Sequence, residues 1–286
     1  MIKIESSRLK AIFHEPGDGF YRGTRFDRGG VADSILFYGE EIAAPWFDTY
    51  RPEMHDAVQG PAEEFSAVGF EEAAPGDTFM KIGVGLLRRP DDAPYDRFRL
   101  YEIADPGKWT LTSGKNRAVF RHELAHWYDY RKEIALTGES GLEISHALTV
   151  KDHPLEGDMY NHNFWTLGSL ATCPGRRLDF PFRPTGHWRA EYDSVALTES
   201  GIRFSRALAK GESVFMGDLQ ADGAALTPYR LAVRQDRISV EIEGDRPVSH
   251  IVFWANHRIA CLEPYIRISV APGETFSWTI KYHITK

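Results

Sequence analysis

Two segments that lie far apart in the chain carry residue types suited to acid/base chemistry. The first is Tyr160-Asn161-His162-Asn163-Phe164-Trp165, and the second is Cys261-Leu262-Glu263-Pro264-Tyr265. The first segment offers the imidazole of His162, and the second offers the lone carboxylate of Glu263 in a mostly apolar run. Facing each other across a pocket, these groups could give a proton to one atom while taking one from another. If the segments meet in space, we expect an enzyme that acts on a sugar.

Opening a cyclic sugar requires that the anomeric hydroxyl lose a proton and that the ring oxygen gain one. Reclosing the ring on the other face inverts C1. A carboxylate and an imidazole titrate near enough to neutrality to exchange protons reversibly, especially when burial raises the carboxyl pKa. This chemistry needs no metal and no redox cofactor. Beside His162, the amides of Asn161 and Asn163 could hold sugar hydroxyls, and Phe164 and Trp165 could offer an apolar face to the ring.

The segment from Tyr160 to Gly168 resembles the Asn-His-x-Tyr-Phe-Asn-Leu signature of the aldose 1-epimerases, also called mutarotases. The matching residues are Asn161, His162 and the aromatic pair Phe164-Trp165. The run Cys261-Leu262-Glu263-Pro264 resembles the context of the family's late glutamate, and Pro272-Gly273-Glu274 is similar to its closing turn.

This resemblance implies that His162 is the general acid at the ring oxygen and Glu263 the general base at the anomeric hydroxyl. It also implies a small sugar as the substrate and a galactose mutarotase-like β-supersandwich of antiparallel sheets.

Two segments of well-known mutarotases are missing, namely Asn-Arg-Ile and Leu-His-Gly-Gly, which supply a substrate arginine and a second histidine. The region where they would fall holds Gly60 to Phe65 and Lys81 instead. The anchoring role could therefore fall to Arg25, Lys81 or Lys132. Glu64, and Asn256 just before the Glu263 segment, are further candidates for substrate binding.

A second motif, His122-Glu123-Leu124-Ala125-His126, matches the H-E-x-x-H pattern of zinc peptidases. That chemistry requires a helix, which places both histidines on one face. A strand would separate residues four apart by roughly 13 Å, too far to bind one ion. Apolar and aromatic residues alternate from Phe120 to Leu136, and this pattern favours the strand interpretation and a coincidental match. We therefore predict no metal.

The elements that must position these residues are short strands. Turn signals containing Gly, Pro and Asp recur along the chain, and between them lie runs such as Phe79–Leu87, Arg237–Ile242 and Ser249–Ala255. Strands of this length between such turns are typical of an all-β sandwich. Because no linker or repeat interrupts the pattern, we expect a single domain over residues 1–286.

Composition excludes several other classes of protein. The 286 residues carry a formal net charge of −7 with mixed signs throughout, which argues against the basic surface expected for nucleic-acid binding. The N-terminus has no apolar signal region, and no apolar run approaches the length of a membrane span. Two cysteines, Cys173 and Cys261, make no disulfide framework. We expect a cytoplasmic protein that needs no cofactor, whereas its oligomeric state is open.

Three functions remain to be separated. The first is an aldose 1-epimerase, and the second is a carbohydrate-binding or carbohydrate-processing protein of the lyase or hydrolase type on the same fold, since one fold hosts several functions. The third is a zinc peptidase built on His122 and His126.

Overall fold

The computed structural model describes residues 1–169, 171–222 and 229–286, and every named element in these ranges is a β-strand. The strands form four antiparallel sheets, of ten, six, four and three strands. In the described ranges, no helix is long and apolar enough to cross a membrane.

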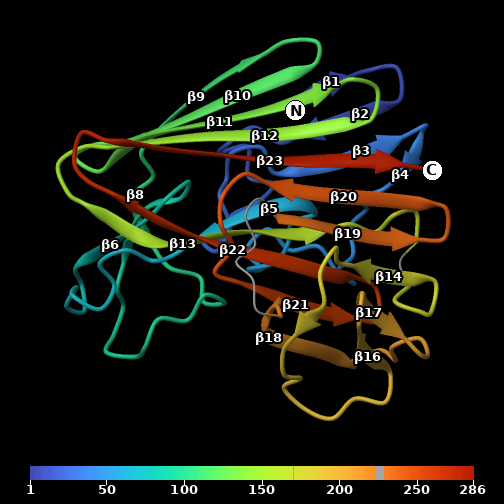
Figure 1. Cartoon of the computed structure of the whole chain (residues 1–286). Coiled ribbons are helices and arrows are strands. Elements are labelled where there is room, and N and C mark those ends of the chain that lie inside the picture. The colour runs from blue at the N-terminus through green and yellow to red at the C-terminus, as the bar shows by residue number, and fades with distance from the viewer. Residues whose placement is uncertain (170, 223–228) are drawn as a thin grey trace.

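The ten-stranded sheet contains the longest continuous hairpins of the chain. In spatial order its strands are β16 (Val195–Thr198), β17 (Gly201–Phe204), β14 (Arg176–Asp179), β19 (Tyr229–Gln235), β20 (Ile238–Gly244), β23 (Thr275–Thr285), β12 (Gly141–Val150), β11 (Tyr128–Thr137), β10 (Arg117–Leu124) and β9 (Lys108–Ser113). Figure 1 shows that the C-terminal strand β23 lies inside this sheet, between β12 and β20.

The six-stranded sheet carries both segments expected to do chemistry. Its strands in spatial order are β15 (Pro184–Thr185), β18 (Ser213–Ala221), β21 (His250–Asn256), β22 (Ala260–Val270), β13 (Leu155–Phe164) and β5 (Gly60–Phe65). Because β13 and β22 are direct neighbours, the fold brings together two segments that are distant in sequence.

Two smaller sheets complete the fold. The four-stranded sheet consists of β1 (Ile2–Glu5), β2 (Leu9–Phe13), β3 (Ala32–Phe37) and β4 (Glu40–Glu41), and the three-stranded sheet of β6 (Thr78–Lys81), β7 (Gly85–Arg88) and β8 (Ile103–Asp105). The run Phe79–Leu87, expected as one strand, is thus the β6–β7 hairpin, and Gly83 at its turn has a φ of +74°. Positive φ is a conformation that glycine adopts at little cost, which explains the reversal there.

The six-stranded and ten-stranded sheets pack face to face. Phe65 of β5 contacts Tyr130 of β11 and Trp278 of β23 edge-on, with ring centroids 5.7 and 6.1 Å apart. The main buried cluster contains side chains from Ile2 to Ile284, so both ends of the chain contribute to one core. On this basis we propose that the chain forms a single domain.

Candidate active site

Antiparallel pairing of β13 with β22 places His162 beside Glu263. Tyr160 pairs with Tyr265 in the register of these strands. His162 lies two residues after Tyr160, and Glu263 lies two residues before Tyr265, so the antiparallel geometry sets them opposite one another on the same face. His162 Nε2 lies 3.2 Å from Glu263 Oε1. The two segments singled out in the sequence therefore meet.

The imidazole of His162 is held between aromatic rings. Its ring stacks on Phe164, two residues along the same face, with centroids 3.7 Å apart and planes 6° apart. Phe26 and Trp254 contact the imidazole edge-on at 6.0 and 5.9 Å. These contacts fix the ring plane, and His162 Nδ1 is buried without a hydrogen-bond partner in the described chain.

Burial favours the uncharged form of both groups. Burial raises the pKa of Glu263 to about 8, even though the positive charges of Arg25 and Arg97 act in the opposite direction. Burial also lowers the pKa of His162 well below its ordinary value, and nearby Arg25, Arg97 and His55 reinforce that shift. Near pH 7 the pair therefore holds one proton, on the carboxyl group, and the imidazole is neutral.

Both groups open onto a cavity of about 830 Å³ on this face of the six-stranded sheet. Its walls combine aromatic rings with charged groups. The lining residues are Arg25, Trp46, His55, Asp56, Pro94, Tyr95, Asp96, Arg97, Phe98, His162, Phe164, Arg189, Phe215, Gly217, Val252, Trp254, Glu263 and Tyr265. A volume of this size falls within the range of small-molecule sites, and rings beside a few polar groups suit a sugar.

Glu64 lies behind the charged wall of the cavity and pairs with the cations there. This buried carboxylate accepts hydrogen bonds from Arg25 Nε, at 2.5 Å, and from the hydroxyl of Tyr160. Lys81 Nζ lies 3.7 Å from its other oxygen. Lys81 Nζ also donates to Tyr95 OH at 2.8 Å. Of the expected substrate-binding residues, Arg25 thus reaches the cavity, whereas Glu64 and Lys81 support its wall from behind.

The structure places Asn161 and Asn163 on the opposite face of β13. Successive strand residues point to opposite sides, so the neighbours of His162 turn away from the cavity. Asn161 Nδ2 donates to Glu63 Oε1 at 3.0 Å, and Asn163 Nδ2 donates to the Leu262 carbonyl at 2.7 Å. Neither amide lines the cavity, and we do not include them in the proposed site.

Lys132 belongs to a separate buried ionic cluster between the two large sheets. Its ammonium group contacts Glu63 and lies 3.3 Å from Asp27 Oδ2, while His146 Nε2 lies 3.3 Å from Glu63 Oε1. Burial raises the pKa of Asp27 to about 6 against the attraction of Lys132. This cluster joins β5 to β11 and β12 and does not line the cavity.

Two further candidates also lie away from His162. Trp165 is fully buried against Tyr282, with ring centroids 5.4 Å apart, and belongs to the main core. Asn256 accepts the backbone N–H groups of Arg258 and Ile259 at 2.8 and 3.1 Å, which makes it a turn-forming residue. It borders a different cavity of about 340 Å³.

The H-E-x-x-H segment is a strand followed by a turn. The alternation predicts the strand, whereas the turn between Leu124 and Tyr128 interrupts the run that was expected to be one strand. His122 lies in β10, and His126 lies in the turn that leads to β11, with a φ of +65°. His122 Nε2 donates to the Pro106 carbonyl at 2.9 Å, and its Nδ1 accepts the Tyr128 hydroxyl at 2.9 Å. The side chain of His126 is 79% exposed and meets Asp152 at 2.8 Å.

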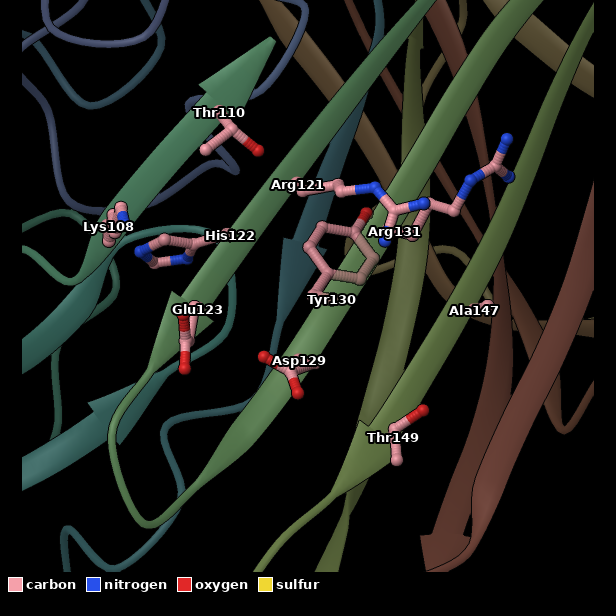
Figure 2. Close-up of a pocket in the computed structure, with 10 residues that line it drawn as sticks. All are labelled: Lys108, Thr110, Arg121, His122, Glu123, Asp129, Tyr130, Arg131, Ala147 and Thr149. Carbon is pink, nitrogen blue, oxygen red and sulfur yellow. The ribbon is translucent and has the colours of Figure 1, made fainter.

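Figure 2 shows that His122 and Glu123 project in different directions from β10, along a cavity of about 510 Å³. Within residues 1–169, 171–222 and 229–286, no group of three or more His, Cys, Asp or Glu side chains is placed to hold a metal ion.

Several cavity residues escaped the sequence analysis. The loop between β7 and β8 supplies Tyr95, Arg97 and Phe98, and the stretch after β4 supplies Trp46 and His55. Arg97 Nη1 donates to Tyr265 OH at 3.1 Å and Tyr160 OH at 3.3 Å. The signal that the sequence offered was a set of aromatic and cationic residues in the turn-rich stretch Pro94 to Phe98, which nothing local connects to His162 or Glu263.

The fold of this chain is similar to that of several solved structures over nearly its whole length. The Slr1438 protein of Synechocystis sp. PCC 6803 superposes with a TM-score of 0.57 at 15% identity, over 99% of this chain and 95% of that one. A candidate aldose 1-epimerase from Escherichia coli K12 gives 0.55 at 12% identity, over 99% and 97%. A GalM/aldose epimerase homologue from C. elegans gives 0.51 at 15% identity, over 99% and 98%. The chain has the aldose 1-epimerase fold.

The expected all-β, galactose mutarotase-like sandwich is therefore confirmed. No protein-family profile matches the sequence, and no curated protein sequence matches it. The superpositions establish the fold. Because the sequence identities are only 12–15%, the activity has to be argued from the chemistry of the site.

Proposed function

We propose that this protein is a divergent aldose 1-epimerase, an isomerase that interconverts the anomers of a small sugar. The observation that supports this proposal is the 3.2 Å contact between His162 Nε2 and Glu263 Oε1 on the floor of an aromatic cavity. The anomeric oxygen and the ring oxygen of a cyclic sugar are bonded to the same carbon. An acid and a base that lie side by side can therefore address both oxygens of one bound sugar.

In the proposed reaction, Glu263 as its carboxylate takes the proton of the anomeric hydroxyl, and protonated His162 gives a proton to the ring oxygen. The bond between C1 and the ring oxygen breaks, its electron pair leaves with that oxygen, and the C1–O bond becomes the aldehyde. Rotation about C1–C2 and the reverse proton transfers close the ring on the other face. Protons and electrons balance, so the enzyme returns to its starting state.

The singly protonated pair can supply this arrangement. Burial keeps the proton on Glu263, and moving it to His162 creates the carboxylate and imidazolium without a change in net charge. The two forms are tautomers of one protonation state, so the pair titrates as a unit. Catalysis by such positioned groups contributes about 10²- to 10⁴-fold each.

Polarimetry of freshly dissolved aldoses tests the proposal. We expect the protein to accelerate the approach of optical rotation to equilibrium for at least one sugar of a neutral and charged panel. A protein that binds sugars in calorimetry but accelerates none of them would be a carbohydrate-binding protein instead. Release of new reducing ends from oligosaccharides would favour a lyase or hydrolase.

A further inference from the structure

Three guanidinium groups line the cavity, and they come from three separate connections of the fold. Arg25 lies between β2 and β3, Arg97 between β7 and β8, and Arg189 between β15 and β16. Arg25 is paired with the buried carboxylate of Glu64 at 2.5 Å. Arg97 approaches the other oxygen of the same carboxylate at 3.6 Å, so Glu64 is shared between two arginines.

Arg189 has no carboxylate within 4 Å among the residues that the structure describes. Its guanidinium carbon lies 3.6 Å from the centre of the Phe215 ring, and its backbone N–H donates to the Phe215 carbonyl at 3.0 Å. Stacking on an aromatic face holds the group in place while leaving its N–H donors free to bind a ligand. The cavity wall thus presents a cation that the protein itself does not neutralise.

The other charged groups in and behind the cavity do not neutralise the positive charge of Arg189. Burial leaves Glu263 largely uncharged near pH 7, as described above. Counting the lining groups and the two charged groups behind them gives four cations and three carboxylates, namely Arg25, Arg97, Arg189 and Lys81 against Asp56, Asp96 and Glu64. A net positive cavity in a chain with a formal charge of −7 is a local feature, and a positive cleft attracts anionic ligands.

We propose that the substrate of this cavity is a sugar that carries an anionic group, either a carboxylate or a phosphate ester. Arg189 and the unshared donors of Arg97 bind the anion, because a guanidinium suits the planar or branched oxygens of both groups. The cavity of about 830 Å³ holds the sugar ring between these arginines and the His162–Glu263 pair. The inference rests on the proposed function for the reaction at C1, but its binding part can be tested alone.

Binding is best measured with methyl glycosides, because their rings cannot open and turnover does not interfere. Isothermal titration of the wild type would compare methyl β-D-glucuronide, the 6-phosphate of methyl β-D-glucoside and methyl β-D-glucoside itself. We expect an anionic ligand to bind at least about tenfold more tightly than the neutral one, with an affinity that falls as salt is added. The tighter of the two anionic ligands identifies the carboxylate or the phosphate as the recognised group.

Variants of exposed arginines give the matched comparison. Arg189→Gln should remove most of the anionic preference, and Arg189→Glu should reverse it. Arg183→Gln, an exposed arginine of the neighbouring stretch that does not line the cavity, should leave the preference intact. Equal affinity for neutral and anionic ligands, absence of binding, or an unchanged preference in Arg189→Glu would each overturn the inference.

The binding inference and the proposed function fail in different ways. If methyl β-D-glucuronide binds through Arg189 but no sugar is mutarotated faster, the anionic site stands and the epimerase proposal fails. If neutral glucose is mutarotated as efficiently as glucuronate and glucose 6-phosphate, the epimerase proposal stands and the anionic site fails.

Discussion

His162 and Glu263 touch across neighbouring strands, with Nε2 and Oε1 3.2 Å apart, and both side chains are about 95% buried. Burial acts on the two groups in opposite directions on the pH scale. It raises the pKa of the carboxyl to about 8 and lowers that of the imidazole. Across the neutral range the pair therefore carries a single proton, and this is the protonation state that ring opening requires.

The pH dependence of activity follows from this state. Loss of the shared proton leaves no acid for the ring oxygen, so kcat/KM should fall as pH rises through about 8. On the acidic side, kcat/KM should begin to fall only well below pH 6.5, where the imidazole of His162 gains a proton and the pair then holds two. Initial rates of mutarotation between pH 4 and 10, corrected for the spontaneous reaction at each pH, provide the profile. A rate that keeps rising above pH 9 would contradict the assignment.

Glu263→Gln should make the folded protein more stable at alkaline pH although it removes the proposed base. The folded carboxyl has a raised pKa, so its contribution to stability is fully present below about pH 4.5 and is lost as pH rises through about 8. Removing the ionisable group should therefore raise the free energy of unfolding at pH 8 to 9 by a few kcal/mol, at about 1.4 kcal/mol per pKa unit, and the melting temperature should rise with it. At pH 4 the variant and the wild type should be close. A variant that is less stable at pH 9 would show that the carboxylate is favourably solvated.

Lys132 is a structural cation in this fold, and replacing it should act on folding. Lys132→Met leaves the buried carboxyl groups of Asp27 and Glu63 without their ammonium partner, at a cost of about 3–5 kcal/mol. Lys151→Met is the matched control, because Lys151 pairs with Glu123 and Asp129 near the surface and should contribute about 0–1 kcal/mol. Chemical denaturation measures both. A Lys132→Met protein of normal stability but raised KM would return Lys132 to the substrate site.

Phe98 offers an exposed ring at the edge of the cavity. Its side chain is 56% exposed, and it contacts His55 and the guanidinium of Arg25 at 4.6 and 5.2 Å. If it stacks on the sugar, Phe98→Ala should weaken binding roughly three- to tenfold with little change in kcat. Leu100→Ala, at a similarly exposed position of the same loop outside the cavity, should change neither constant. Equal effects of the two substitutions would assign Phe98 to loop structure.

Much of the fold was accessible from sequence because turn residues and alternation are local signals. The runs around Ile238 and Val252 became β20 and β21, and the H-E-x-x-H segment became a strand and a turn. The contact of His162 with Glu263 was expected from the family resemblance. No local pattern specifies that β13 and β22 are neighbours, because that pairing is a long-range property of the sheet.

The surroundings of the pair were harder to predict. Asn161 and Asn163 were expected beside the sugar because they flank His162 in the sequence. The segment is a strand, and its alternation turns both amides away from His162. Arg97 reaches the cavity from a turn-rich stretch, and side-chain types alone do not show which surface loop folds over a site. The two adjacent acids Glu63 and Glu64 resemble a solvated turn, yet both faces of β5 are covered, and each acid has its own buried cation.

The central claim is that His162 and Glu263 act as one proton-exchanging unit, and NMR exchange spectroscopy of the two anomers at equilibrium tests it most directly. The accelerated rate should be compared for wild type, His162→Ala, Glu263→Gln and the double variant, each shown to be folded by its melting curve. We expect each single variant to lose about 10²- to 10⁴-fold of the acceleration and the double variant to lose little more, because groups that act as a unit are not additive. Anomer exchange as fast in His162→Ala as in the wild type would contradict the claim.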